Sequence, residues 1–284
     1  MATLREIRRR IRSVRNTAQI TKTMEMVSAA KLRRAQTAVE AARPYATALR
    51  EVLQNLAQAT GEAVHPAFVR REPVRSRALV LITSDRGLAG AFNANLIRTV
   101  EIRVRETGRP TRLVLLGKKG YDYFRRRKTD ILAFRNDLGG VADWKYAEAL
   151  SQDLLQRFLN GEFDEVDLVT THFKSALSRE IVIEPLLPLG AERGSGGPAR
   201  DYIFEPGPEE ILARIVPYFL AMRIFTALAE SAASEHGARM IAMGSATKNA
   251  NEMIQTLTLH MNRTRQATIT REIVEIVAGA EALK

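Results

Sequence analysis

The chain has 284 residues, of which 45% are hydrophobic and 26% charged, and its net charge is +11 at pH 7. This balance excludes a chain that is disordered by composition. No window approaches eighteen uninterrupted apolar residues, so we expect no segment that crosses a membrane directly. The absence of cysteine excludes disulfides, thiolate metal ligands and cysteine nucleophiles. The basic excess predicts an acidic partner: nucleic acid, an anionic membrane surface or an acidic protein.

Residues 1–58 are predicted to form one long helical segment. Thr3 and Glu6 have the spacing of a capping box, and apolar or small residues then recur at alternating steps of three and four. Pro44 is expected to kink this helix or to start a new segment that ends near Gln58. The arginine-rich first fifteen residues would also suit an organelle transit peptide. The apolar repeat continues past them, which favours the helix.

After a linker at residues 59–76, the pattern changes to an α/β domain over residues 77–190. Strands are predicted at 78–83, 112–117, 130–134, 166–173 and 180–187, with helices at 93–106, 121–126 and 144–160. Strands that alternate with helices predict a mostly parallel, Rossmann-like sheet with right-handed crossovers. A Gly/Pro-rich linker at residues 191–208 follows.

Residues 209–284 are predicted to form a second, longer helix. From Leu212, alternating steps of three and four residues reach sixteen side chains, of which only His236 can carry a charge. A sustained 3.5-residue repeat predicts a left-handed coiled coil. The two terminal helices flank the α/β domain, so their simplest pairing is antiparallel, and part of the longer helix should run unpaired or meet another protein. We expect a kink or local softness at Pro217 and Gly244.

No convincing active site emerges from the residues. Asp85–Asn93 and Gly117–Gly120 lie where phosphate loops occur, yet neither has the GxGxxG or GxxxxGK[ST] pattern, so their glycines are expected to serve tight turns. His65, His172, His236 and His260 are too scattered for a metal site. We expect His236 to be a packed or register-setting residue. The sequence therefore predicts no catalytic, cofactor-binding or metal-binding residues.

Four stretches of the sequence resemble one known family. They are residues 20–34 (ITKTMEMVSAAKLRR), 83–90 (TSDRGLAG), 235–243 (EHGARMIAM) and 269–281 (ITREIVEIVAGAE). In order and over essentially the whole chain, they are similar to the gamma subunit of F-type, proton-translocating ATP synthases of the bacterial type.

The resemblance implies a mechanical role without catalysis. The paired helices would be the central rotor shaft inside a ring of three alpha and three beta subunits. The α/β domain would join the epsilon subunit and the membrane ring of c subunits. Nucleotide chemistry, in synthesis or hydrolysis of ATP, would belong to alpha and beta. The lack of cysteine and of a transit peptide favours a peripheral protein on the cytoplasmic face of the bacterial inner membrane.

The resemblance also implies functional residues. Positions expected to contact beta or to serve coupling are Lys22, Met24, Lys31, Arg34, Arg239, Gln266, Thr270 and Glu272. Lys22, Lys31 and Arg34 would face an acidic segment of beta. The apolar C-terminal tip, expected to turn within an apolar collar of the ring, comprises Ile269, Ile273, Ile276 and Val277.

Two other functions remain as alternatives. A pI near 10.2 suits a nucleic-acid-binding coiled coil on an α/β domain, although aromatic residues are few and no RNA-binding motif occurs. A stand-alone nucleotide enzyme fits less well because the phosphate motif is missing.

Overall fold

The structure is a computed structural model that describes residues 3–60, 65–138, 140, 142–189 and 207–281. The chain forms two compact units. The helical unit comprises Met1–Val27 with Met240–Lys284, and the α/β unit comprises Ser28–Arg239. This division passes through both long helices, whereas the domain boundaries that we proposed from the sequence follow the linkers.

The two long helices are continuous elements, α1 (Leu4–Thr60) and α5 (Pro208–Glu281). Pro44 and Pro217 both lie inside these helices, so neither proline ends its helix and no new segment begins at Pro44. The capping box is confirmed, because the Thr3 amide donates to Glu6 Oε2 at 2.9 Å and the Glu6 amide donates to Thr3 Oγ1 at 3.3 Å.

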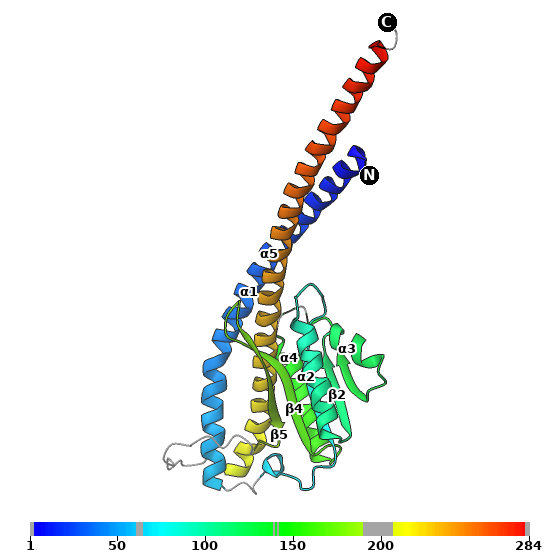
Figure 1. Ribbon diagram of the computed structural model, residues 1–284. Coiled ribbons are helices and arrows are strands. Elements are labelled where there is room, and N and C mark those ends of the chain that lie inside the picture. The colour runs from blue at the N-terminus through cyan, green and yellow to red at the C-terminus, as the bar shows by residue number, and fades with distance from the viewer. Residues whose placement is uncertain (1–2, 61–64, 139, 141, 190–206, 282–284) are drawn as a thin grey trace. The chain divides into compact units, whose positions relative to one another are not determined.

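In the helical unit, the ends of α1 and α5 lie side by side and run antiparallel, as predicted (Figure 1). The hydroxyls of Thr21 and Thr247 are 2.8 Å apart, and the Glu25 carboxylate lies beside Gly244. Between these two contacts the residue number rises along one helix and falls along the other, as an antiparallel pair requires. Apolar side chains of both helices are buried along this line, among them Ile7, Ile11, Ala18, Met243 and Ala250.

The α/β unit contains a five-stranded sheet with the order β3-β2-β1-β4-β5. Its strands are β1 (Arg77–Ile82), β2 (Thr111–Leu116), β3 (Ile131–Arg135), β4 (Glu165–Phe173) and β5 (Arg179–Leu187). All neighbouring strands are parallel except β4 and β5, which confirms the mostly parallel sheet. The chain order changes direction between β1 and β4, so the loops at the carboxyl ends of the parallel strands border a crevice of the kind that often binds ligands.

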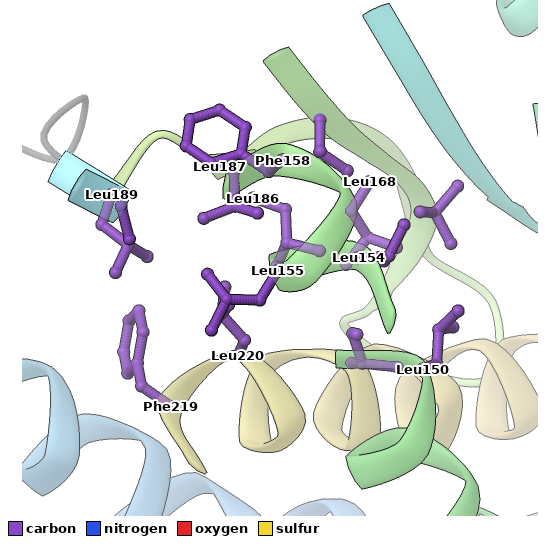
Figure 2. Close-up of a cluster of buried hydrophobic side chains, with 14 of the residues drawn as sticks. Leu150, Leu154, Leu155, Phe158, Leu168, Leu186, Leu187, Leu189, Phe219 and Leu220 are labelled. Atoms are coloured by element: carbon purple, nitrogen blue, oxygen red, sulfur yellow. The ribbon is translucent and has the colours of Figure 1, made fainter. Parts of the chain in front are cut away.

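Helices cover both faces of this sheet. They are α2 (Phe92–Thr107), α3 (Lys118–Arg125) and α4 (Trp144–Leu159), and a short 3-10 helix, η2 (Pro66–Phe68), lies in the segment predicted as a linker. Side chains of α2 and α3 form one core with the sheet, whereas α4, α5 and the end of α1 form the other. Figure 2 shows the second core, where leucines of α4, β4 and β5 meet Phe219 and Leu220 of α5.

Within the α/β unit, α5 is buried on more than the one face that the 3.5-residue repeat predicted. Val216, Leu220 and Ile224 lie off the predicted repeat, yet each is completely buried. By length and composition α5 could cross a membrane, with a mean hydropathy of 1.6 in its most apolar window. However, 56% of that window is buried inside the protein. Packing in the core therefore accounts for much of its apolar character.

The Arg239 clamp and the candidate coupling residues

The loop between β1 and α2, residues 83–91, is held by a dense set of polar contacts. The Ser84 amide donates to Asn93 Oδ1 at 3.0 Å, and the Ser84 hydroxyl donates to the Arg86 carbonyl at 2.6 Å. Asp85 joins this loop to its two neighbours, because one carboxylate oxygen accepts from the Lys118 amide at 3.0 Å and the other from the Leu138 amide at 3.1 Å. Three loops at the carboxyl edge of the sheet are thus tied together.

These contacts also argue against phosphate binding at this loop. The Lys118 amide at the start of α3 is the kind of donor that would face an anion, but it is occupied by Asp85. Gly117, at φ 98°, comes so close to β1 that an added Cβ would overlap the Thr83 carbonyl oxygen. This close approach confirms that Gly117 serves a tight strand-to-helix turn.

Arg239 of α5 forms hydrogen bonds with the same loop. Its Nε donates to the Gly87 carbonyl at 3.2 Å, and its Nη2 donates to the Arg86 carbonyl at 3.1 Å. Nη2 also lies 2.7 Å from the Glu235 carboxylate, one helical turn earlier. Arg239 is only 8% exposed, so these contacts replace solvent around its charge. We call this arrangement of Arg239, Glu235, His236 and the carbonyls of Arg86 and Gly87 the Arg239 clamp.

His236 completes the clamp as an acceptor. Arg239 Nη1 lies 3.3 Å from His236 Nδ1. A guanidinium can only donate, so Nδ1 must be unprotonated and the proton of the neutral ring must reside on Nε2. Burial, with the Arg239 and Lys31 charges, lowers the pKa of His236 to about 4, and the Gly140 backbone opposes this only in part. His236 is therefore uncharged near neutral pH.

The opposite side of the His236 ring is tightly enclosed. A Cβ added to Gly140, which has a φ of 68°, would lie 2.5 Å from His236 Nε2. Nε2 is buried and has no hydrogen-bond partner of good geometry within the described ranges. Burial also raises the pKa of Glu235, although the Arg239 charge works against this. The side chains of His236 and Arg239 in the clamp are thus buried, and the His236 ring is tightly packed.

A cavity of about 380 Å³ lies beside the clamp within the α/β unit. Its lining includes Lys31 of α1, four residues of the clamp (Arg86, Glu235, His236 and Arg239), and Asp85 and Asp137 of the neighbouring loops. Two of its acidic groups are already engaged, since Asp85 accepts two amides and Glu235 pairs with Arg239. Across the described segments, no group of three or more His, Asp or Glu could hold a metal ion. The cavity offers no set of groups that specifies one ligand.

The predicted basic positions fall in different environments. Lys22 is exposed and pairs with Glu25 at 3.2 Å, and Met24 is half-buried in the helical unit. Lys31 and Arg34 are exposed on α1 in the α/β unit, where both border a second, alanine-lined cavity of about 210 Å³. Arg239 lines the first cavity together with Lys31, and its guanidinium makes the contacts of the clamp. In this chain its guanidinium is therefore committed to internal contacts.

The C-terminal end of α5 carries the remaining predicted residues, and every one is exposed: Gln266, Thr270, Glu272, Ile269, Ile273, Ile276 and Val277. Four of these are large apolar side chains, with exposed fractions from 47% for Ile269 to 70% for Ile276. The helix remains regular here as far as Glu281. An apolar helical end therefore stands uncovered in the described chain, as the unpaired stretch predicted.

Sequence reasoning missed the clamp partners of Arg239. His236 was correctly expected to be packed, but its role as an acceptor for Arg239 was not foreseen. The Asp85–Gly87 turn was interpreted only as a tight connection. One signal was available, because Glu235 and Arg239 have the i, i+4 spacing of a helical ion pair.

Comparisons with known proteins give a consistent result. The ATP synthase family profile matches residues 3–283. The ATP synthase gamma chain of Moorella thermoacetica is 50% identical over 284 residues, and that of Anaeromyxobacter dehalogenans is 50% identical over 294, each alignment covering both chains completely.

Solved structures agree at the level of the fold. A chain from the central stalk and c-ring of the Tetrahymena thermophila mitochondrial ATP synthase matches with a TM-score of 0.63 and 27% identity, covering 80% of this chain and 99% of that one. A chain from the Euglena gracilis mitochondrial ATP synthase matches with a TM-score of 0.68 and 20% identity, covering 99% and 94%. These matches favour the rotor interpretation over a nucleic-acid-binding coiled coil, and the chain belongs to the ATP synthase gamma-chain family.

Proposed function

We propose that this protein is the central rotor shaft of a proton-translocating ATP synthase. The helical unit turns inside a ring of three alpha and three beta subunits, and the α/β unit connects the shaft to the epsilon subunit and the membrane ring of c subunits. Rotation driven by proton flow forces each beta site in turn through its catalytic states. The chain itself performs no nucleotide chemistry.

One observation carries this proposal: the exposed apolar end of α5. Ile269, Ile273 and Ile276 remain exposed although they are large and apolar. Exposed apolar surface on one contiguous segment marks an interaction site. A helix end that is uncovered on all sides suits an occupant that surrounds it, and a ring of subunits does so without fixing one rotational angle.

We include the predicted coupling residues in this proposal. Lys22, Lys31 and Arg34 are exposed cations on α1, available to an acidic segment of beta. Charges at the rim of an interface contribute more to specificity and association rate than to affinity. Gln266, Thr270 and Glu272 are polar groups next to the apolar tip. They would contact the ring where α5 enters it.

The location follows from the complex. A shaft connected to a membrane ring is a peripheral membrane protein. We place it on the cytoplasmic face of a bacterial inner membrane, since the two relatives at 50% identity are bacterial chains aligned over their full length. The proposed role of this chain in ATP synthesis and hydrogen-ion transport likewise depends on its assembly into the complex.

Rotation can be observed directly. The chain has no cysteine, so Arg109→Cys, at an exposed position after α2, provides a unique attachment point for a bead. The variant is assembled with alpha and beta, and the ring is fixed to a surface. We expect ATP to drive rotation of the bead in one direction. A bead attached to a beta subunit of the same complex serves as the control and should not rotate.

Two outcomes would count against the proposal. If ATP is hydrolysed by the assembled ring while the bead on position 109 stays still, the chain is a static component. If the chain without alpha and beta hydrolyses ATP, the nucleotide chemistry lies in this protein instead.

A further inference from the structure

The Arg239 clamp is the place where α5 holds the loops at the carboxyl edge of the sheet. Arg239 reaches from α5 to two main-chain carbonyls, and Asp85 extends the connection to the loops after β2 and β3. Hydrogen bonds to main-chain atoms do not depend on flexible partner side chains. Torque applied to the sheet can therefore reach α5 through these few hydrogen bonds.

The orientation of Arg239 depends on an uncharged neighbour. Arg239 Nη1 needs an acceptor, and His236 Nδ1 supplies one at 3.3 Å. A protonated imidazole would present a donor and a positive charge to the guanidinium, which would disrupt the contact. The imidazole is itself fixed, because Gly140 packs against its other nitrogen with no room for a Cβ.

We propose that His236 is a positioning residue for rotor coupling, which as a neutral acceptor holds Arg239 on the β1–α2 loop and so makes α5 and the sheet turn together. This inference rests on the proposed function for its consequence, but its structural part stands independently. His236 acts through its contact with Arg239.

Two substitutions separate the acceptor from the bulk of the ring. In His236→Asn, the side-chain oxygen is bonded to Cγ, as Nδ1 is in histidine, so it can accept from Arg239. His236→Leu fills a comparable volume but offers no acceptor. If only packing matters, leucine should be the milder change, whereas an acceptor role predicts that asparagine is.

The first readout is amide hydrogen exchange of the full-length chain. The reporters are Ser84, Lys118 and Leu138, whose amides hold the three tied loops. We expect His236→Leu to speed their exchange about tenfold or more, the equivalent of losing one hydrogen bond to a charged group, and His236→Asn to have little effect. The amides of β2, in the sheet interior, should stay protected in both variants and show that the fold is intact.

The second readout uses the complete complex in sealed vesicles, with ATP hydrolysis and proton pumping measured together. We expect His236→Leu to keep hydrolysis but to pump fewer protons per ATP, and His236→Asn to restore the ratio. Unchanged exchange in His236→Leu, or equal damage by both substitutions, would overturn the positioning role. Faster exchange with normal pumping would overturn the link to coupling. Failure of the proposed function itself would be distinguishable from these outcomes, because the bead on a complex with His236 unchanged would then not rotate.

Discussion

At the scale of single residues, the environment decides what a side chain does more than its type does. Arg239, His236 and Glu235 are adjacent on α5, yet one is a buried cation with four polar partners, one is neutral and one is its counter-ion. The sequence predicted a packed His236 but not the Arg239 clamp, because the loop that Arg239 binds lies about 150 residues away in the chain. Contacts of that kind depend on the fold.

Protonation of His236 should make the protein less stable in acid. Its pKa is about 4 when folded against an ordinary value of 6.5, so between these values the unfolded chain binds a proton that the folded chain does not. This contribution to stability is therefore complete above about pH 6.5 and falls by about 2–3 kcal/mol as the pH drops toward 4. The charged or titratable groups that face the ring or share its cavity are Arg239, Glu235, Lys31, Arg86, Asp85 and Asp137.

Denaturant unfolding between pH 4 and pH 7 would measure this effect. The side chain introduced by His236→Asn cannot titrate, so only the other titratable groups of the protein should set the pH dependence of this variant's stability. The wild-type curve should be steeper than the variant curve over this range. Parallel curves would mean that folding does not lower the pKa of His236.

Gly117 provides a second test at the residue scale. It has a positive φ and no room for a Cβ against the Thr83 carbonyl. Gly117→Ala should therefore cost about 3 kcal/mol or more, because backbone strain adds to a steric overlap that only main-chain movement can relieve. Gly108 also has a positive φ but has no atom within 4 Å of the added Cβ. Gly108→Ala, the control, should cost about 1–2 kcal/mol, and equal losses in urea unfolding would contradict the steric argument.

At the scale of elements, periodicity predicted the helices well and their surroundings poorly. All three helices and all five strands predicted for the α/β domain appear where they were expected, within a few residues, since β-branched runs and glycines at their ends mark them locally. The repeat in α5 indicated one buried face. Within the α/β unit, however, α5 packs against α4, the sheet and α1, so residues off that face, such as Val216 and Leu220, are buried too.

Because the repeat does not predict burial fully, it also does not identify the positions where a charged substitution should destabilise the helix pair most. Ile254 and Leu257 lie on the predicted face but are only half-buried, whereas Ile11 is 8% exposed. Ile11→Asp should destabilise the helical unit by about 3 kcal/mol or more, because it buries an unpaired carboxylate. Ile20 lies on the same helix with 60% exposure, so Ile20→Asp is a matched control that should change little.

Circular dichroism melts of the two variants would decide the matter. We expect early loss of helical signal only for Ile11→Asp. If both variants melt like the wild type, the ends of α1 and α5 do not depend on their pairing.

At the scale of the whole molecule, the chain separates stability from function along its length. The α/β unit contains its own two cores, and the helical unit is held by the pairing of α1 with α5 up to about Thr264. Beyond that point α5 has no covering element among the residues that the structure describes. Selection for folding alone would not keep large apolar residues there, so their presence favours an external partner.

This division gives a prediction about the tip of α5. Ile276 is 70% exposed in the chain, so Ile276→Asp should leave its thermal stability unchanged to within about 0.5 kcal/mol. In the proposed complex the same side chain is covered by the ring, and a carboxylate there would lose its hydration without gaining a partner. We therefore expect Ile276→Asp to weaken association with alpha and beta, measured by titrating labelled chain into the separated subunits. Ile102→Asp, at a 45% exposed position on α2 in the α/β unit, is the control and should assemble normally. Equal affinities for the two variants would show that the tip lies outside the ring contact, and the apolar end of α5 would then need a different occupant.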